Sequence, residues 1–153
     1  MGVGEANLAG NVHGGWIMKL CDEVAGIAAI RHSGHRVVTA SIDRMNFRSP
    51  IFVGDLVTLS ASVNAAWRTS MEVGVRVEKE NVWTGERVHT STAYLTMVAL
   101  DTEGEPVTIP ALTSETPEDL RRAREAQLRR DNRLTEREQI TAERGGAPDS
   151  MHY

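Results

Sequence analysis

The chain of 153 residues has one cysteine, few aromatic side chains and no long hydrophobic run. A single thiol, Cys21, excludes an intrachain disulfide. No apolar stretch approaches the ~18 residues expected of a membrane-spanning helix. The first residues, Met1 to Glu5, lack the basic start and apolar core of a secretory signal. We therefore expect one cytoplasmic protein of single-domain size that does not enter a membrane.

The charge distribution disfavours two further classes of protein. A formal net charge of -4 argues against a nucleic-acid scaffold. The spacing of four histidines does not resemble that of a metal site: His13, His32, His35 and His89. We expect no metal, no separate cofactor and no nucleic-acid partner.

Residues 16–30 form the most informative stretch that is present. Their only charged side chains are Lys19, Asp22 and Glu23, which share one stripe of a helix, while apolar residues occupy most of the remaining circumference. Such a helix must be wrapped by other structure. A carboxylate midway along it is either held by a cation, such as Lys19 or a nearby arginine, or functional. We favour a functional role for Asp22.

The pattern changes from helical to β-type after Gly34, a natural helix-stop residue. Four β-rich stretches follow, at residues 37–43, 56–63, 71–78 and 88–100. The turns that join them, around residues 49–55, 64–69 and 83–86, are each too short for a parallel crossover, so we expect a mostly antiparallel sheet in an α+β protein. A sheet of this kind needs a cover on one face, and the apolar helix is the best candidate.

The end of the chain has a different composition. Residues 118–144 are rich in arginine and glutamate and contain four large aliphatic residues: Leu120, Leu128, Leu134 and Ile140. Because acidic and basic residues alternate, we interpret residues 116–153 as a charged tail that is a solvated helix or only partly ordered. Residues 1–115 then form the main domain.

Two motifs give the chain a recognisable pattern. They are Asn7-x-x-Gly10-x-x-x-Gly14-Gly15-x-x-Met18-x-x-x-Asp22 and Asp43-x-x-x-Phe47-x-x-Pro50-x-x-x-Gly54-Asp55. Together with Arg68-Thr69-Ser70-Met71-Glu72-Val73, they resemble the acyl-CoA thioesterases of the hotdog superfamily, which include cytosolic long-chain acyl-CoA hydrolases and bacterial relatives. The resemblance covers about residues 5–112 and implies a sheet wrapped around one long central helix.

The resemblance also implies a site. In this family the turn asparagine and the helix carboxylate are the catalytic pair, which fall here on Asn7 and Asp22. Backbone N–H groups at a helix start lack intrahelical partners, so those around Gly14 and Gly15 suit the oxyanion of a thioester. The segment Arg68, Thr69 and Ser70 resembles the strand that borders the CoA groove, although it could equally be an ordinary strand entry.

The implied activity is hydrolysis of acyl-CoA to free fatty acid and CoA. The alternative is a non-catalytic acyl-CoA sensor on the same fold, because fold alone does not set function. Hydratases of the superfamily carry a histidine five positions after the helix aspartate, where this chain has Ile27. The family forms dimers in which the asparagine of one subunit meets the aspartate of the other, usually assembled as trimers of dimers, so we expect a composite site in a homohexamer.

Overall fold

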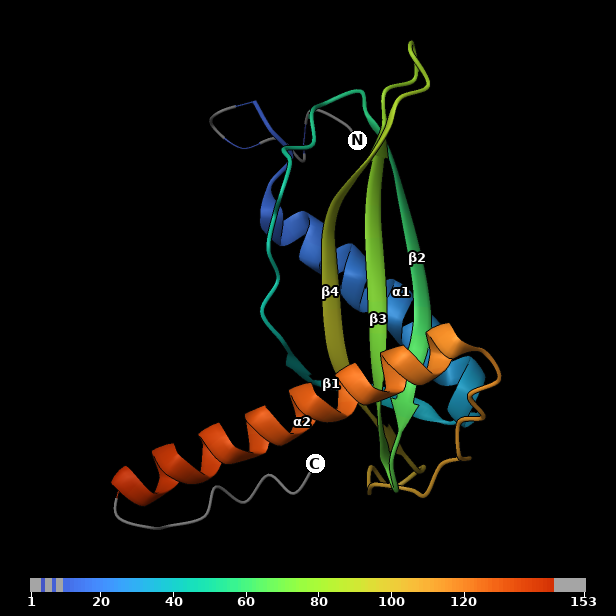
Figure 1. The fold of residues 1–153 in the computed structure, drawn as a ribbon, viewed down its shortest axis with the longest axis vertical. Coiled ribbons are helices and arrows are strands. Elements are labelled where there is room, and N and C mark those ends of the chain that lie inside the picture. The colour runs from blue at the N-terminus through green and yellow to red at the C-terminus, as the bar shows by residue number, and fades with distance from the viewer. Residues whose placement is uncertain (1–3, 5–6, 8–9, 145–153) are drawn as a thin grey trace.

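The computed structural model describes residues 4, 7 and 10–144, which form two helices and one four-stranded sheet (Figure 1). The elements, in chain order, are α1 (Gly14–Ser33), β1 (Arg36–Ile42), β2 (Leu56–Ala66), β3 (Ser70–Glu80), β4 (Arg87–Leu100) and α2 (Pro117–Glu143). The strand order is β1-β4-β3-β2, and every neighbouring pair is antiparallel. The predicted α+β class and the antiparallel sheet are confirmed.

Local sequence explains where α1 begins and ends. His13 caps its first turn, because the imidazole Nδ1 accepts a hydrogen bond from the Gly15 N–H at 3.0 Å. Gly34 ends the helix with φ +72°, a left-handed conformation that favours glycine, and donates its N–H to the Ile30 carbonyl at 2.8 Å.

One stripe of α1 packs on the sheet. Four residues at intervals of four are almost fully buried there: Ile17, Cys21, Ala25 and Ala29. The small side chains of Cys21, Ala25 and Ala29 let the helix lie close to the apolar face of β3 and β4. There, Val73, Val75, Val77, Leu95 and Met97 complete the core. The opposite side of α1 is not wrapped in the single chain, because Ile27 and Ile30 remain 53% and 49% exposed.

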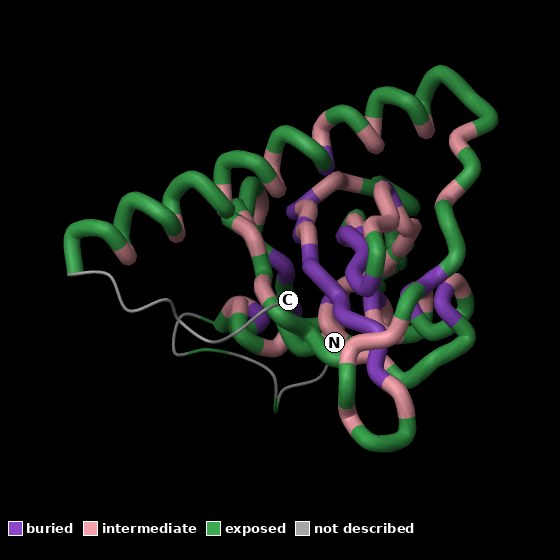
Figure 2. The backbone as a smooth tube through the Cα atoms, turned by 90° about the horizontal axis from the view of Figure 1, so that it is seen from below, coloured by how far each residue is buried: buried purple, intermediate pink, exposed green. Residues whose placement is uncertain are grey.

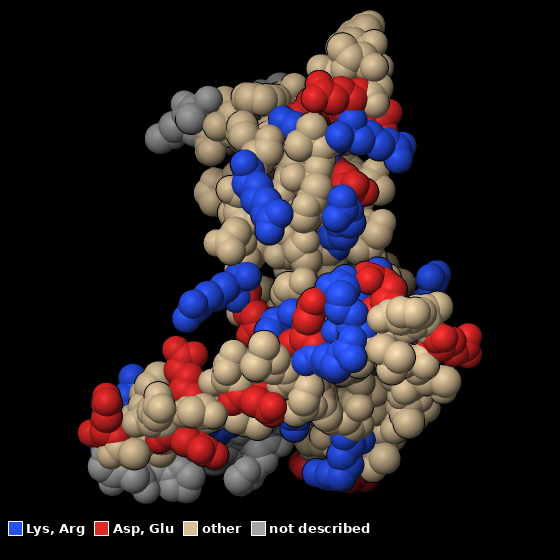
Figure 3. All heavy atoms as spheres, viewed as in Figure 1, with Lys and Arg blue, Asp and Glu red and all other residues tan. Residues whose placement is uncertain are grey.

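Residues 117–143 of the charged tail form one continuous helix, α2. α2 begins with a capping box between Thr116 and Asp119 and then crosses the outer face of the sheet, opposite to α1 (Figure 1). Figure 2 shows its exposed outer side, and Figure 3 shows basic and acidic side chains mixed along it. Neither α1 nor α2 is long and apolar enough to span a bilayer.

A buried ion pair holds α2 to the sheet. Arg129 donates to both carboxylate oxygens of Glu72 on β3, at 2.9 and 2.7 Å, and Asn64 of β2 donates to the same carboxylate at 3.0 Å. The Arg129 guanidinium also lies 3.6 Å from the centre of the Tyr94 ring. Glu72 is only 1% exposed, so its charge depends on these partners.

Candidate active site

Asp22 faces the edge strand β1. The Thr39 hydroxyl donates a short hydrogen bond to the Asp22 Oδ1 atom, and the same hydroxyl lies 3.3 Å from the Met97 sulfur. Asp22 is half-buried, whereas Thr39 is exposed at the sheet edge. The carboxylate is therefore oriented by a neutral partner while one side of it stays accessible.

The charged neighbours of Asp22 bear on the two interpretations of this carboxylate. Lys19 binds Glu23 at 2.6 Å instead of Asp22. Within residues 4, 7 and 10–144, Asp22 takes part in no ion pair with a lysine, arginine or histidine. A partly buried carboxylate without a compensating cation is unusual for a purely structural residue. The observation favours a functional role.

The two predicted oxyanion donors at the start of α1 differ in whether their N–H group is already hydrogen-bonded. The Gly15 N–H is already bonded to the His13 imidazole. The Gly14 N–H has no hydrogen-bond partner in the described part of the chain. A Cβ at Gly14 would lie 3.3 Å from the Phe47 ring, a tight contact. Gly14 is thus the available donor, and Gly15 would become one only if His13 turned away.

Asn7 lies on a tight turn before the helix. Its side-chain Oδ1 accepts the Asn11 N–H at 3.1 Å, and its backbone carbonyl accepts the Gly10 N–H at 3.0 Å. Gly10 has φ +79°, which a residue with a side chain adopts at a cost. Asp22 follows Gly14 by eight residues, about 12 Å along a helix that rises 1.5 Å per residue. Within one chain, the turn and the carboxylate therefore sit at different heights of α1.

The segment predicted to bind CoA lies in and after the turn between β2 and β3. Thr69 and Ser70 are buried, and Arg68 is exposed. The Ser70 hydroxyl faces α2, where Arg130 donates to it at 3.4 Å, so it lies on the opposite face of the sheet from α1 and Asp22. The structure does not bring Ser70 to the Asp22 carboxylate, and the CoA-binding role of the segment stays a prediction.

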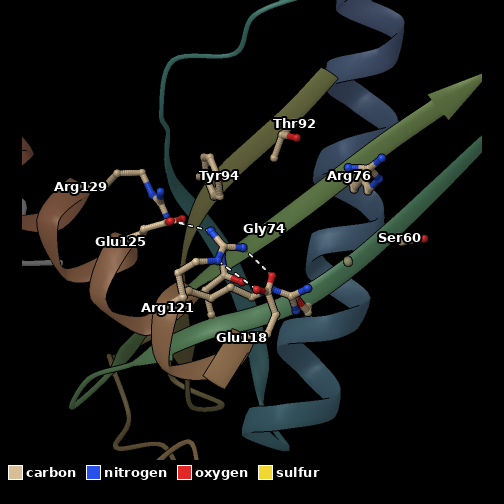
Figure 4. A pocket seen from close by; sticks show the side chains of 13 residues that line it. Ser60, Gly74, Arg76, Thr92, Tyr94, Glu118, Arg121, Glu125 and Arg129 are labelled. Atoms are coloured by element: carbon tan, nitrogen blue, oxygen red, sulfur yellow. Dashed lines mark hydrogen bonds and ion pairs between the residues drawn. The ribbon is translucent and has the colours of Figure 1, made fainter. Parts of the chain in front are cut away.

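A separate cavity of about 310 Å³ lies on the outer face, between α2 and strands β2 to β4 (Figure 4). Its arginines face carboxylates: Arg121 contacts Glu118 and Glu125, and Arg129 contacts Glu72. Because its charges are compensated internally and it lies across the sheet from α1, this cavity is not part of the site at Asp22.

Thr39 is the site residue that sequence reasoning missed. It stands in the run Val37-Val-Thr-Ala-Ser-Ile42, where a polar residue in an edge strand is unremarkable. The register between β1 and β4 is needed to recognise it. In that register Thr39 pairs with the buried Met97, so the Thr39 side chain faces α1.

Comparison with known proteins adds the decisive observation. Residues 9–84 match the Thioesterase superfamily. The uncharacterized acyl-CoA thioester hydrolase YkhA of Bacillus subtilis is 41% identical over 116 residues, which cover 76% of this chain and 67% of that protein. The chain belongs to the thioesterase superfamily. The predicted resemblance to its hotdog-fold acyl-CoA thioesterases is confirmed.

Two solved structures show how closely this thioesterase resembles its relatives. An apo-hexameric acyl-CoA thioesterase is 40% identical with a TM-score of 0.85, covering 89% of this chain and 87% of that one. An acyl-CoA hydrolase from Staphylococcus aureus, in complex with butyryl coenzyme A, coenzyme A and coenzyme A disulfide, is 33% identical with a TM-score of 0.85 over 93% of this chain and 87% of that one.

The Staphylococcus aureus hydrolase has also been characterised as three single alanine variants, each 32% identical to this chain with TM-scores of 0.84 to 0.85. The replaced residues are an asparagine, an aspartate 15 positions later and a threonine 17 positions after that. In this thioesterase, Asn7, Asp22 and Thr39 have the same two separations.

Proposed function

We propose that this thioesterase hydrolyses acyl-CoA to free fatty acid and CoA, with Asp22 as the catalytic carboxylate. The observation that carries the proposal is the half-buried Asp22, bonded to Thr39 and paired with no cation in the described chain. The relatives named as acyl-CoA hydrolases support the substrate class. The shared spacing of Asn7, Asp22 and Thr39 supports the choice of residues.

The chemistry needs an activated nucleophile and a donor for the carbonyl oxygen. In one route Asp22 takes a proton from water, the water oxygen attacks the thioester carbon, and electrons move onto the carbonyl oxygen. In the other route Asp22 attacks the carbon directly, and water then hydrolyses the resulting anhydride. In both, a Gly14 N–H at the positive end of α1 stabilises the oxyanion. Gly14 and Asp22 of one chain lie about 12 Å apart along α1, so this donor comes from the second subunit proposed below. The C–S bond then breaks, and CoA leaves as a thiolate that is protonated.

Thr39 positions the carboxylate in this proposal. Thr39→Val keeps the shape of the side chain but removes the hydroxyl, so Asp22 loses its orienting bond. We expect kcat to fall by about tenfold or more, with a smaller change in KM. Thr39→Ser should recover most of the rate because it restores the donor. Equal kcat values for Thr39→Val and the unmodified enzyme would remove Thr39 from the mechanism.

We further propose that the site is completed by a second copy of the chain. The turn that carries Asn7 and the side chain of Asp22 lie about two helical turns apart along α1. The apolar side of α1 that carries Ile27 and Ile30 is uncovered, and β1 is an open sheet edge with Val38 and Ile42 exposed. A dimer across β1 covers both and brings Asn7 of one subunit to Asp22 of the other. The hexameric relative supports a trimer of such dimers.

We propose a reaction without a metal or separate cofactor, because Asp22 and backbone N–H donors are sufficient for each step. We also propose a cytoplasmic location, a setting in which Cys21 stays reduced.

Release of free CoA thiol from a panel of acyl-CoAs tests the function and separates an enzyme from an acyl-CoA sensor. Burial raises the pKa of the Cys21 thiol to about 11, so this thiol should contribute little background in a thiol-detecting assay near pH 8. Turnover with several acyl-CoAs would support the proposal. Saturable acyl-CoA binding without CoA release would overturn it in favour of the sensor.

A further inference from the structure

The contacts of α2 follow the strand order of the sheet. Three arginines mark its path from β2 to the end of β1: Arg122 contacts Ser62, Arg129 contacts Glu72 and Tyr94, and Arg133 contacts Asp43. Arg133 is therefore level with the edge strand. Residues 134–143 continue past it, and both Figure 1 and Figure 2 show this end of α2 projecting beyond the sheet.

We call residues 134–143 the α2 extension. Ten helical residues are about 15 Å long, the width of about three neighbouring strands. Nearly all of the extension is exposed, including its two large apolar residues, Leu134 and Ile140. These two apolar side chains lie beyond the protein's own sheet, so another surface that covers them would remove apolar area from water.

We propose that the α2 extension packs on the outer face of the second subunit's sheet, across the β1 edge. The inference rests on the proposed dimer, in which two β1 strands join the sheets side by side. Such joining places the partner's outer face directly beyond β1, where the extension points. A two-fold axis makes the contact reciprocal, so each subunit both extends its α2 and receives the other's.

A hollow beside the edge strand supports the same interface. A cavity of about 680 Å³ lies between α2 and the end of β1, lined by Ser41, Ile42 and Asp43 on one side and by Arg133 and Glu136 on the other. The buried Ser41 hydroxyl has no hydrogen-bond partner within the described chain. Ser41 and Ile42 belong to the edge strand at which the proposed second subunit joins, so the hollow lies next to the proposed dimer contact of α2.

Two shortened chains test the proposal. A chain that ends at Arg133 loses the extension but keeps the contacts of α2 with its own sheet, whereas a control chain that ends at Arg144 keeps the extension. We expect the first to raise the dissociation constant of the dimer at least about tenfold in fluorescence-detected sedimentation over a dilution series. The control should stay within about twofold of the full chain. Circular dichroism should show that both chains remain folded.

A matched pair of double variants tests the contact without shortening the chain. Leu134→Ala with Ile140→Ala should weaken the dimer, whereas Leu120→Ala with Leu128→Ala, on the part of α2 above its own sheet, should not. An unchanged dimer dissociation constant in the shortened chain would overturn the inference. A dimer that stays intact while only larger assemblies dissociate would also overturn it, because it would assign the extension to contacts between dimers.

These experiments measure the association of subunits and do not depend on catalytic turnover. A dimer weakened by loss of the extension in a protein that releases no CoA would sustain the inference and overturn the proposed function. A fully active protein whose dimer dissociation constant does not change when the extension is removed would support the proposed function and overturn the inference.

Discussion

Asp22→Ala should lower the turnover of acyl-CoA by on the order of a hundredfold or more while leaving the fold intact. The variant removes the group that activates water or attacks the thioester. It does not leave a cation unpaired, since the neighbouring Lys19 is bonded to Glu23. The measurement is steady-state release of CoA thiol, with thermal unfolding as the check on the fold.

Glu23→Ala is the matched control for this prediction. Glu23 is the next residue on the same helix and is also a carboxylate, but it is exposed and paired with Lys19. Exposed ion pairs contribute little to stability, so Glu23→Ala should retain nearly full activity and stability. Equal activity of the Asp22→Ala and Glu23→Ala enzymes would exclude Asp22 from the chemistry.

Arg129→Ala should lower the free energy of unfolding by about 3–5 kcal/mol, because it leaves the Glu72 carboxylate buried without its cation. Glu72 is 1% exposed, and among the described residues only Asn64 would remain as its hydrogen-bond partner. The contact with the Tyr94 ring is lost as well. Chemical denaturation of the variant and of the unmodified protein measures the difference.

Two comparisons isolate the buried charge as the cause. Arg121→Ala, on the same helix, breaks exposed pairs with Glu118 and Glu125 and should change the free energy of unfolding very little. Replacing both Glu72 and Arg129 with methionine should cost less than Arg129→Ala, because no buried charge remains. If Arg129→Ala were no more damaging than Arg121→Ala, the ion pair would not be what holds α2 to the sheet.

The main domain could be predicted from local patterns. The apolar run around Asp22 and the stop at Gly34 predict α1, and alternation in residues 71–78 predicts β3. These signals are strong because burial of one face imposes a period on the sequence. Asp22 could be picked out for the same reason, because a charged residue interrupts the pattern of apolar residues along this helix.

The partners of these residues could not be predicted in the same way. The bond between Thr39 and Asp22 depends on how α1 lies over β1, and no local pattern encodes that packing. Glu72 looks like an ordinary outward-facing residue of β3, and Arg129 looks like part of a solvated helix. Their burial appears only when α2 docks, which is a tertiary event between segments 57 positions apart.

Mixing two inactive variants tests the composite site most directly. A dimer of one Asn7→Ala subunit and one Asp22→Ala subunit contains one site with both mutations and one site with neither. If each site draws Asn7 and Asp22 from different chains, random reassociation should restore about a quarter of the unmodified activity per chain. A verified mixed dimer with no recovered activity would contradict the account, because it would place both residues of the site in a single chain.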